Sequence, residues 1–410
     1  MMRSMFAGVT GLRSHQLMLD VVSNNIANVN TTGFKASRVL FADTLSQTLR
    51  NAAGGAFETT SVNPLQVGLG VTVKSTAATF TTGSLQLTDR PLDTALSGDG
   101  FFVVDVAGDQ LYTRAGSFAL DSNMKMVDGA GGLVQGWMFE PDGSISTTGR
   151  LTDISLATYS QMPATATETV SIKGALSAGT AVGDTVETLT KVIDGLGTEN
   201  QVQLRFTKTT STDWTVELFD STGTSLGSAN LTFSASDGSL VTPTTPPSFT
   251  LTPPVSGAQT FSFALDMGTG TNGLHQYGNS SSLALEQDGK EAGELRDFGI
   301  SEQGVITGRY SNGKMKDIAQ IAVAHFNNNE GLLKQGETHY RSSSVSGGAQ
   351  VGVAGENATG AIKAGVLEMS NVDLAREFTD MILAQRGFQA SSRVITTSDD
   401  MIQELVNLKR

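Results

Sequence analysis

Apolar residues recur every seven positions at both ends of the chain, whereas apolar and polar residues alternate through much of the stretch between them. A seven-residue repeat places an apolar stripe along one side of a slightly supercoiled helix, and such a stripe is buried against another helix. The pattern therefore predicts one helix over about 4–29, a second over about 364–408, and a contact between them. The stripes consist of Met5, Leu12, Leu19, Val22, Ile26 and Val29 in the first helix, and of Leu367, Leu374, Met381, Phe388, Ile395 and Ile402 in the second.

From Val71 the period changes to two, which is typical of strands with one buried face. This pattern continues to about residue 150 and resumes after about 285. The stretch between is rich in Thr and Ser and has the short, turn-bounded strand pattern of a sandwich or barrel. We therefore expect a second β-domain inserted into the first.

These patterns predict a mixed α and β, multidomain chain. Its long N- and C-terminal helices form a coiled-coil-like domain, and two nested all-β domains lie between them. Periodicity leaves two uses of the stripes open: they tie the two termini together within one chain, or they also face neighbouring chains in a polymer. The expected boundaries are 1–33 and 361–410 for the helical domain, 34–70 for an irregular connecting segment with a flexible Ala/Gly run at 52–56, 71–150 and 285–360 for the first β-domain, and 151–284 for the inserted outer β-domain.

Composition narrows the classes of partner. The net charge of −13 provides no basic surface for the phosphates of a nucleic acid or for an anionic membrane. The chain has no cysteine, so disulfides and zinc sites built on sulfur are excluded. No segment has the roughly 20 apolar residues that membrane insertion needs. Arg13 and the polar residues after it interrupt any secretory signal, so we expect either a cytoplasmic protein or export without a cleaved signal peptide.

No group of residues has the spacing of a catalytic or metal site. The Gly98–Gly100 turn lacks the third glycine of a nucleotide-binding loop, and neither Asp266 nor 327–330 has the alternating ligands of a calcium loop. Hydrolase and metalloprotease motifs are missing too. We expect no enzyme activity, no catalytic residue, no cofactor and no metal. The four histidines are scattered and are expected to be packed or interface residues: His15, His275, His325 and His339.

Four sequence blocks occur in a specific order: SNNIANVNTTGFK at 23–35, SGDGFFV at 97–103, YTRAGSF at 112–118 and QRGFQASSRVI at 385–395. Together they closely resemble the blocks of the bacterial flagellar rod and hook proteins. The resemblance covers 1–150 and 285–410 and leaves the inserted domain outside it. The positions that carry it in the first and last blocks are Asn24, Asn25, Asn28, Asn30, Gly33, Phe34, Lys35, Gln385 and Arg386.

Because distal rod subunits lack a second domain of this size, the resemblance implies a hook subunit. Such a subunit forms a homo-polymer, a curved tube that acts as a universal joint and transmits torque from rod to filament. The resemblance implies a place at the distal end of the basal body, outside the cell. The implied partners are the flagellar rod subunit, the hook cap, the hook–filament junction proteins, the hook-length control protein and the flagellar (type III) export apparatus.

Two other functions stay open. One is a distal rod-type subunit with an unusual insertion, which would build a straight tube. The other is a secreted, β-rich adhesin or binding protein that acts as a monomer through its Thr-rich middle domain. Replacing Leu374 and Met381 with aspartate should abolish a polymer under the hook and rod hypotheses and leave binding intact under the adhesin hypothesis.

Overall fold

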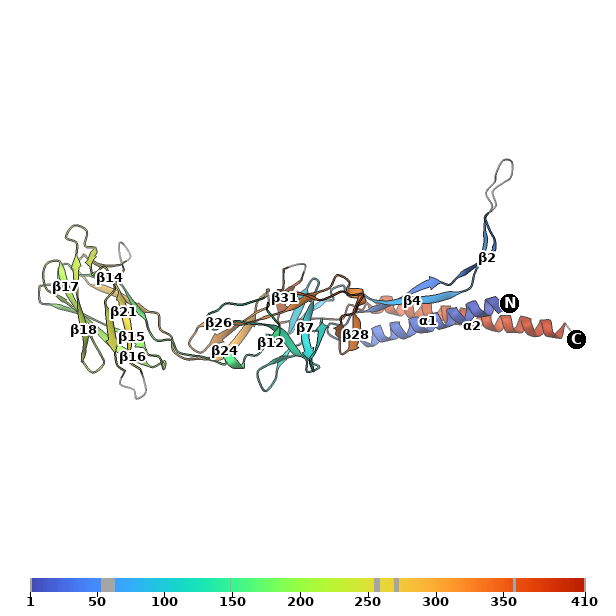
Figure 1. Ribbon diagram of the computed structural model, residues 1–410, viewed down its shortest axis with the longest axis horizontal. Helices are drawn as coiled ribbons and strands as arrows, with labels where there is room; N and C mark the ends of the chain where they lie inside the picture. Colours follow the sequence, from blue (N-terminus) through green and yellow to red (C-terminus); the bar gives the residue numbers. More distant parts are fainter. Residues whose placement is uncertain are drawn as a thin grey trace, which may run out of the picture. The chain divides into compact units, whose positions relative to one another are not determined.

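The computed structural model divides the chain into two compact units (Figure 1). Unit 1 comprises Met1–Ala157, Phe298–Thr307 and Asp317–Arg410, and unit 2 comprises Thr158–Asp297 and Gly308–Lys316. Most of the Ala/Gly run expected at 52–56 and of the glycine-rich loop after Asp266 lies outside the described residues. The structure describes residues 2–52, 63–147, 149–253, 259–268, 273–356 and 359–408.

Unit 1 contains both helices, and the strands that lie wholly within it have two to eight residues. Three further strands include residues of both units: β24 (Gly293–Ile300), β25 (Val305–Tyr310) and β26 (Met315–Ile321). The remaining elements of unit 1 are α1 (Met2–Ala27), β1 (Ser37–Asp43), β2 (Ser46–Arg50), β3 (Leu65–Gly68), β4 (Val71–Ala78), β5 (Leu85–Leu87), β6 (Thr94–Ser97), β7 (Phe101–Val106), β8 (Asp109–Thr113), β9 (Ala119–Leu120), β10 (Met126–Val127), β11 (Leu133–Met138), β12 (Thr152–Asp153), β27 (Val323–His325), η3 (Asn329–Gly331), β28 (Leu333–Gly336), β29 (His339–Arg341), β30 (Gln350–Gly352), β31 (Ala361–Ala364), β32 (Val366–Glu368) and α2 (Leu374–Asn407).

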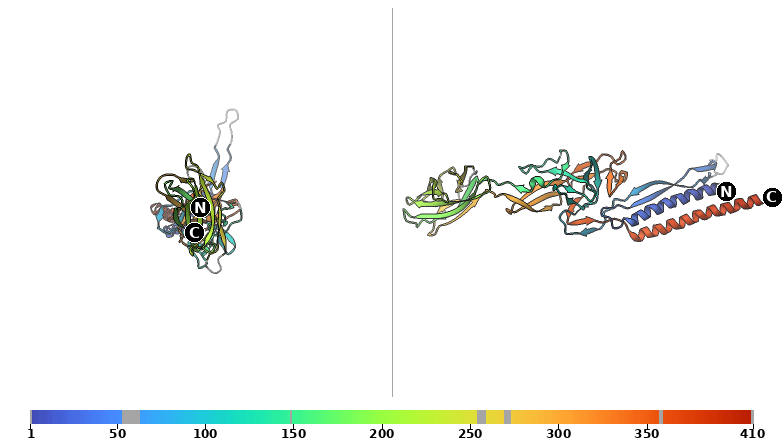
Figure 2. Two further views of the ribbon diagram at one scale, coloured as in Figure 1. Left: turned by 90° about the vertical axis from the view of Figure 1, so that its left-hand side faces the viewer. Right: turned by 90° about the horizontal axis from the view of Figure 1, so that it is seen from below.

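The two helices run side by side in opposite directions, as the right view of Figure 2 shows. Ser4 near the start of α1 lies opposite Ser398 near the end of α2, with 3.3 Å between their hydroxyl oxygens. Asp373 caps α2: its side chain accepts a hydrogen bond from the amide of Ala375 at 2.9 Å. Such a cap satisfies an amide that the first helical turn leaves unpaired, which fixes where the helix begins.

The β-domain of unit 1 is built on β7 and its neighbours. In the sheet, β11 pairs with β7 and β26, β8 pairs with β7, and β29 joins β8 to β28. Phe101 and Phe326, whose rings meet edge to face, lie in its apolar core with Tyr340 and Trp137. Two antiparallel ribbons, β1–β4 and β2–β3, leave this domain, and β1–β4 packs along α1.

Unit 2 contains two five-stranded sheets that share one apolar core. The first has the order β15-β16-β17-β18-β19, and the second has β20-β21-β14-β22 with β23 on β14. Burial alternates along β16, so its Val202, Leu204 and Phe206 point into the core beside Trp214. The elements are η1 (Ala157–Tyr159), β13 (Gln161–Met162), β14 (Thr169–Leu176), β15 (Thr185–Ile193), β16 (Glu199–Lys208), β17 (Asp213–Phe219), β18 (Ser225–Phe233), β19 (Leu240–Thr242), β20 (Ser248–Leu251), β21 (Phe261–Asp266), β22 (Leu274–Gln276) and β23 (Ser282–Gln287).

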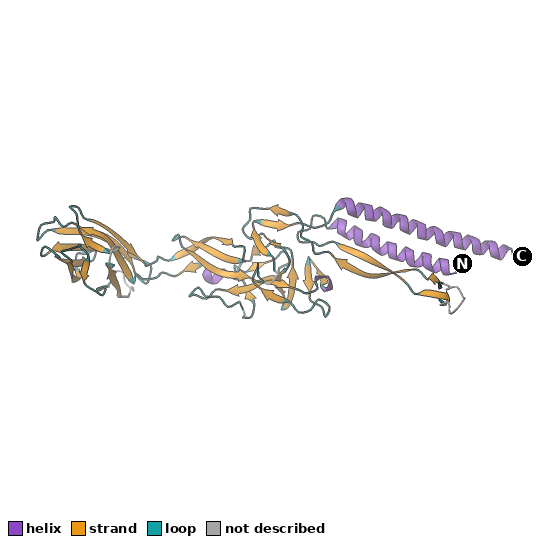
Figure 3. Cartoon of the chain, turned by 90° about the horizontal axis from the view of Figure 1, so that it is seen from above, coloured by secondary structure: helices purple, strands orange, loops and turns teal. Residues whose placement is uncertain are grey.

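The expected fold class, mixed α and β with a coiled-coil-like helical domain and two nested all-β domains, is wrong. The chain is mainly β, with 44% strand against 17% helix, and the described helices longer than one turn are α1 and α2 at its two ends (Figure 3). The terminal helices do pair, and their contact contains glycine and serine residues of α1 as well as the stripe residue Ile395. Seven-residue spacing predicts where large apolar residues lie along a helix, but it does not identify the small residues in the contact.

The expected start of the second helix at about 364 is also wrong, because α2 begins at Leu374. The preceding residues form β31, which pairs with β6, and β32, which pairs with β5. Leu367 therefore lies in a strand opposite Gln86, and its position seven residues before Leu374 is a coincidence of spacing. Residues 34–70, expected to be irregular, contain β1, β2 and β3. Strand pairing over such long separations leaves no local sequence pattern.

Candidate assembly surface and buried junction

Small residues line part of the contact between α1 and α2. Gly8, Gly11 and Ser14 are among the buried residues of α1. A Cβ added to Gly8 would lie 3.0 Å from Ile395 Cγ1, and one added to Gly11 would lie 2.8 Å from Ser391 Oγ. Because no side chain separates the backbones at these positions, the two helices approach closely. We call this contact the small-residue seam.

The tightest point of the seam is a glycine notch in α2. A Cβ on Gly387 would lie only 2.4 Å from Cε1 of His15, so the imidazole ring of α1 occupies the space that any other side chain would need. On its other side the ring lies near Phe41 of β1, with 6.0 Å between ring centroids. His15 is thus a packing residue that fixes the register of the two helices.

Most of the stripe residues are half-buried. Val22 is buried and Leu374 is exposed. The side chains in between keep part of their surface accessible, so their role in an assembly interface stays a prediction. The half-buried stripe residues are Met5, Leu12, Leu19, Ile26, Val29, Leu367, Met381, Phe388, Ile395 and Ile402.

A second set of large apolar side chains on the helices is exposed and was missed by the seven-residue pattern. At least half of each of these side chains is accessible. An amphipathic helix with apolar residues outside its packed face is typical of a helix with a further partner. Apolar residues spaced three and four positions apart, next to the stripes, were the sequence signal that could have revealed this set. The set is Phe6, Phe378, Ile382, Leu383, Met401, Leu405 and Val406.

The β2–β3 ribbon is exposed on both faces. Every residue of both strands is exposed, including Leu49 and Leu65 with about half of their surface accessible. An isolated two-stranded ribbon is only marginally stable in water. The ribbon and the apolar set on the helices are therefore candidate surfaces for contact with another chain.

A buried cluster of charges, which we call the junction, consists of Lys35, Arg114 and Glu368. Lys35, which follows α1, donates to Glu368 Oε1 at 2.6 Å and to the carbonyl of Thr81 at 2.8 Å, and both charged side chains are fully buried. The same Glu368 Oε1 accepts from the amide of Gly83 at 2.9 Å. The backbone carbonyl of Glu368 accepts from the amide of Gly33 at 2.8 Å. One residue thus joins the segments after α1, after β4 and before α2.

Arg114, in the loop after β8, is the second buried cation of the junction. Its Nη1 donates to the carbonyl of Gly98 at 2.8 Å and lies 3.7 Å from Glu368 Oε2. Its guanidinium lies 5.2 Å from the centre of the Phe101 ring, and Nη2 lies 4.0 Å from the largely exposed Asp99 carboxylate. Arg114 therefore connects the junction to the core of the β-domain.

Burial dominates the electrostatics of the junction. Burial lowers the pKa of Lys35, although the adjacent Glu368 carboxylate opposes the shift. Burial also lowers the pKa of Arg114, again against the effect of Glu368. The pKa of Tyr340, which lies nearby, is raised by burial. Because both cations are fully buried, water screens their charges poorly and each depends on Glu368.

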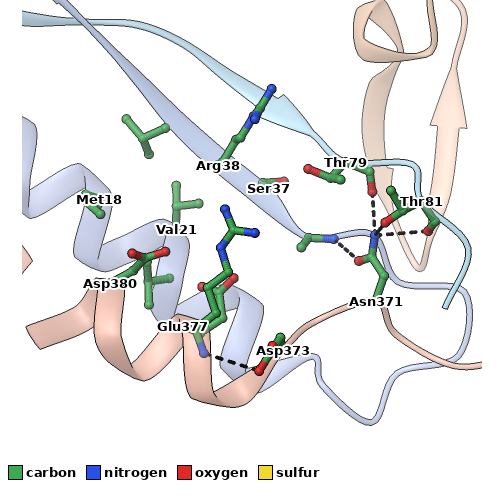
Figure 4. Close-up of a pocket in the computed structure, with 14 residues that line it drawn as sticks. Met18, Val21, Ser37, Arg38, Thr79, Thr81, Asn371, Asp373, Glu377 and Asp380 are labelled. Carbon is green, nitrogen blue, oxygen red and sulfur yellow. Dashed lines mark hydrogen bonds between the residues drawn. The ribbon is translucent and has the colours of Figure 1, made fainter. Parts of the chain in front are cut away.

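Two asparagines tie the helices to the β1–β4 ribbon. Asn371 Oδ1 accepts from the amide of Ala36, and its Nδ2 donates to the carbonyl of Thr79 just after β4 (Figure 4). The buried Asn25 donates to the carbonyl of Ser37 at 2.7 Å and to Glu377 Oε1 at 3.1 Å. Burial raises the pKa of Glu377, and the hydrogen bond from Asn25 opposes that shift.

The residues that carry the sequence resemblance divide into structural and exposed positions. Asn25, Gly33 and Lys35 are buried in the contacts just described, and Asn28 donates to the carbonyl of Asn24. The Phe34 ring is 4.8 Å from the Lys334 ammonium. In contrast, Asn24, Asn30, Gln385 and Arg386 are exposed. Sequence reasoning missed Glu368, for which a single sequence provides no signal, and it singled out neither Arg114 nor Gly387, although they lie in the 112–118 and 385–395 blocks.

The described histidines make ordinary packing contacts. His339 Nε2 lies 2.6 Å from Asp128 Oδ2 in a buried pair, and His275 Nδ1 lies 2.8 Å from the carbonyl of Gly273. Within the described ranges, no three His, Asp or Glu side chains gather as a metal site would need. No described helix is long and apolar enough to cross a membrane.

Comparisons with known proteins cover nearly the whole chain. The curated flagellar hook protein FlgE of Borreliella burgdorferi is 38% identical over 445 aligned positions that include 100% of both chains. The chain belongs to the flagellar hook protein family. Four family models match it in order: flagella basal body rod protein at 5–35, flagellar hook protein FlgE/F/G D1 domain at 95–178, flagellar basal body protein FlaE D2 domain at 180–290, and flagellar basal body rod FlgEFG protein C-terminal at 363–408.

Other relatives of this hook-family chain are hook and rod proteins of the flagellum. The flagellar hook protein FlgE of Salmonella typhimurium is 32% identical over 98% of both chains. The flagellar basal-body rod protein FlgG of Bacillus subtilis is 30% identical over 100% of both. The solved structure of Helicobacter pylori flagellar hook protein FlgE2 has a TM-score of 0.52 at 15% identity and covers 69% of this chain and 100% of its own, which shows a shared fold. The chain is accordingly a structural, homo-polymeric protein of the bacterial flagellum.

Proposed function

We propose that this chain is the structural subunit of the flagellar hook, a curved helical tube that acts as a universal joint and transmits torque from rod to filament. The observation that carries the proposal is the set of exposed apolar side chains on α1 and α2, in a chain whose two ends match the rod and hook models. A heterologous contact that does not close on itself produces a helical filament. The exposed set and the half-buried stripes are the proposed self-assembly interface.

Assembly would remove this apolar surface from water. Burying one large apolar side chain completely stabilises a contact by about 1.5–3 kcal/mol, so the exposed half of each residue in the set contributes roughly 1 kcal/mol. Several such side chains recur along both helices and on the β2–β3 ribbon. Repeated contacts of this size favour an ordered polymer over the free subunit.

The finer partners follow from the family resemblance. We propose contacts with the flagellar rod subunit at one end of the tube and with the hook cap and hook–filament junction proteins at the other. The hook-length control protein and the flagellar export apparatus complete the proposed set.

The test replaces Ile382 with aspartate. Its side chain is mostly exposed, so the charge should leave the subunit folded and disrupt the polymer. Gln389→Asp, which adds the same charge to an exposed polar position of α2, is the matched control. In cells lacking the native gene, electron microscopy of basal bodies should show curved tubes with the control variant and none with Ile382→Asp. Normal tubes with Ile382→Asp would contradict the proposed interface.

A distal rod-type subunit is the second candidate, favoured by the full-length match to the Bacillus subtilis rod protein. Basal bodies from cells that lack the gene separate the two functions. A complete rod that ends without a curved tube supports the hook subunit, whereas a truncated rod supports the rod subunit.

A further inference from the structure

Glu368 has an unusual position among the described residues, because it is the one carboxylate fully buried between two fully buried cations. Lys35 and Arg114 come from the segment after α1 and from the β-domain, whereas Glu368 comes from the segment that leads into α2. Its Oε1 is fully used by Lys35 and Gly83, and its Oε2 faces Arg114.

Tight backbone packing surrounds the same carboxylate. Gly33, with a φ of +68°, lies so close to the next loop that a Cβ there would be 2.5 Å from the amide nitrogen of Ala115. A Cβ on Gly83 would be 2.0 Å from the carbonyl oxygen of Met369. The junction is therefore one packed contact to which all of these segments contribute.

We propose that Glu368 is the positioning residue that locks the terminal helices to the β-domain of unit 1, and that the junction closes only when the C-terminal segment delivers this carboxylate. Without Glu368, Lys35 and Arg114 are two buried cations close to each other, and the one other carboxylate paired with Arg114 is that of Asp99, which is largely exposed and cannot neutralise both. Removing one partner of a buried ion pair leaves an uncompensated charge and is strongly destabilising. Chain segments that contain only the two cations would thus stay apart.

The lowered pKa values of Lys35 and Arg114 agree with this role, since they report buried cations that water does not stabilise. The proposal goes beyond the hook function, because it concerns closure within one chain. A subunit whose helices are held rigidly can pass an applied force from its helices to its β-domain, whereas an open junction would act as a swivel.

The experiment measures amide hydrogen exchange in the full-length protein at a concentration where it is monomeric. Glu368→Gln removes the charge and keeps the shape, and Lys35→Met/Glu368→Gln removes one cation as well. Glu286→Gln is the matched control, because Glu286 pairs with Lys173 on an exposed surface. We expect Glu368→Gln to speed exchange at Gly33 and Gly83 at least tenfold while the amides of β7 keep their protection.

The double variant should recover most of the protection lost in Glu368→Gln, and Glu286→Gln should match the wild type. Wild-type exchange at Gly33 and Gly83 in Glu368→Gln would overturn the proposal. So would a double variant no better protected than the single one, or an equal loss of protection across β7. If Glu368→Gln does not fold, the folded or unfolded state of the double variant decides. Failure of the wild-type chain to form tubes would refute the hook function and leave this test unaffected.

Discussion

Replacing Gly387 with alanine should destabilise the helix pair when His15 is present and stabilise it when His15 is absent. The added Cβ would lie 2.4, 2.5 and 2.8 Å from three atoms of the His15 ring, well inside normal contact. Overpacking of this kind costs about 1–3 kcal/mol. Against it, alanine in a helix interior is better than glycine by about 1 kcal/mol. The net effect in the wild-type background is a loss of roughly 0–2 kcal/mol.

In a His15→Ala background the ring is gone, so only the helix propensity remains and Gly387→Ala should stabilise by about 1 kcal/mol. The difference between the two backgrounds is a coupling free energy of about 1–3 kcal/mol, as expected for residues in direct contact. Chemical denaturation followed by far-UV circular dichroism at the helical minimum measures the free energy of unfolding of the wild type and of the three variants. The seam contacts themselves predict this change of sign.

The matched control is Ala390→Gly. Ala390 is exposed on the same helix, so this change should cost about 1 kcal/mol in both backgrounds. If Gly387→Ala stabilises the protein equally with and without His15, the ring does not occupy the notch and the packing described for the seam is wrong.

Three further predictions concern single residues. Asp373→Ala removes the cap of α2 and should cost about 1 kcal/mol, measured by faster amide exchange in its first turn. Burial alone would raise the pKa of Asp128, but hydrogen bonds from His339 and from backbone amides lower it below its ordinary 3.8. Its contribution to stability is therefore present above the unfolded pKa and lost as pH falls through the folded one, and Asp128→Asn should flatten the acid limb of a stability–pH titration. Phe206→Ala, in the core of unit 2, should cost about 3–5 kcal/mol, followed by Trp214 fluorescence.

The sequence predicted α1 closely, over 4–29 against the observed Met2–Ala27, because helix periodicity is a local property. It misplaced the start of α2, because β32 owes its conformation to pairing with the distant β5. Hydrophobic patterns do not register glycine and serine, so they could not predict the small-residue seam. Lys35 and Glu368 would be expected on the surface from composition alone, since charged residues are rarely fully buried unless paired. Only the three-dimensional fold shows that the two are partners.

The small-residue seam also decides which side chains are left for neighbouring chains. Because glycine and serine allow α1 and α2 to approach closely, large apolar residues such as Phe378 and Leu405 are not needed in the helix–helix contact and remain exposed. Widening the seam would shift the exposed rows of α2 against those of α1. Gly387→Ala should therefore weaken polymerisation although it alters no exposed apolar residue, and removing the His15 ring in the same chain should recover it. Sedimentation of polymer from purified subunits measures both. Equal loss in the single and double variants would mean that Gly387 itself faces a neighbouring chain.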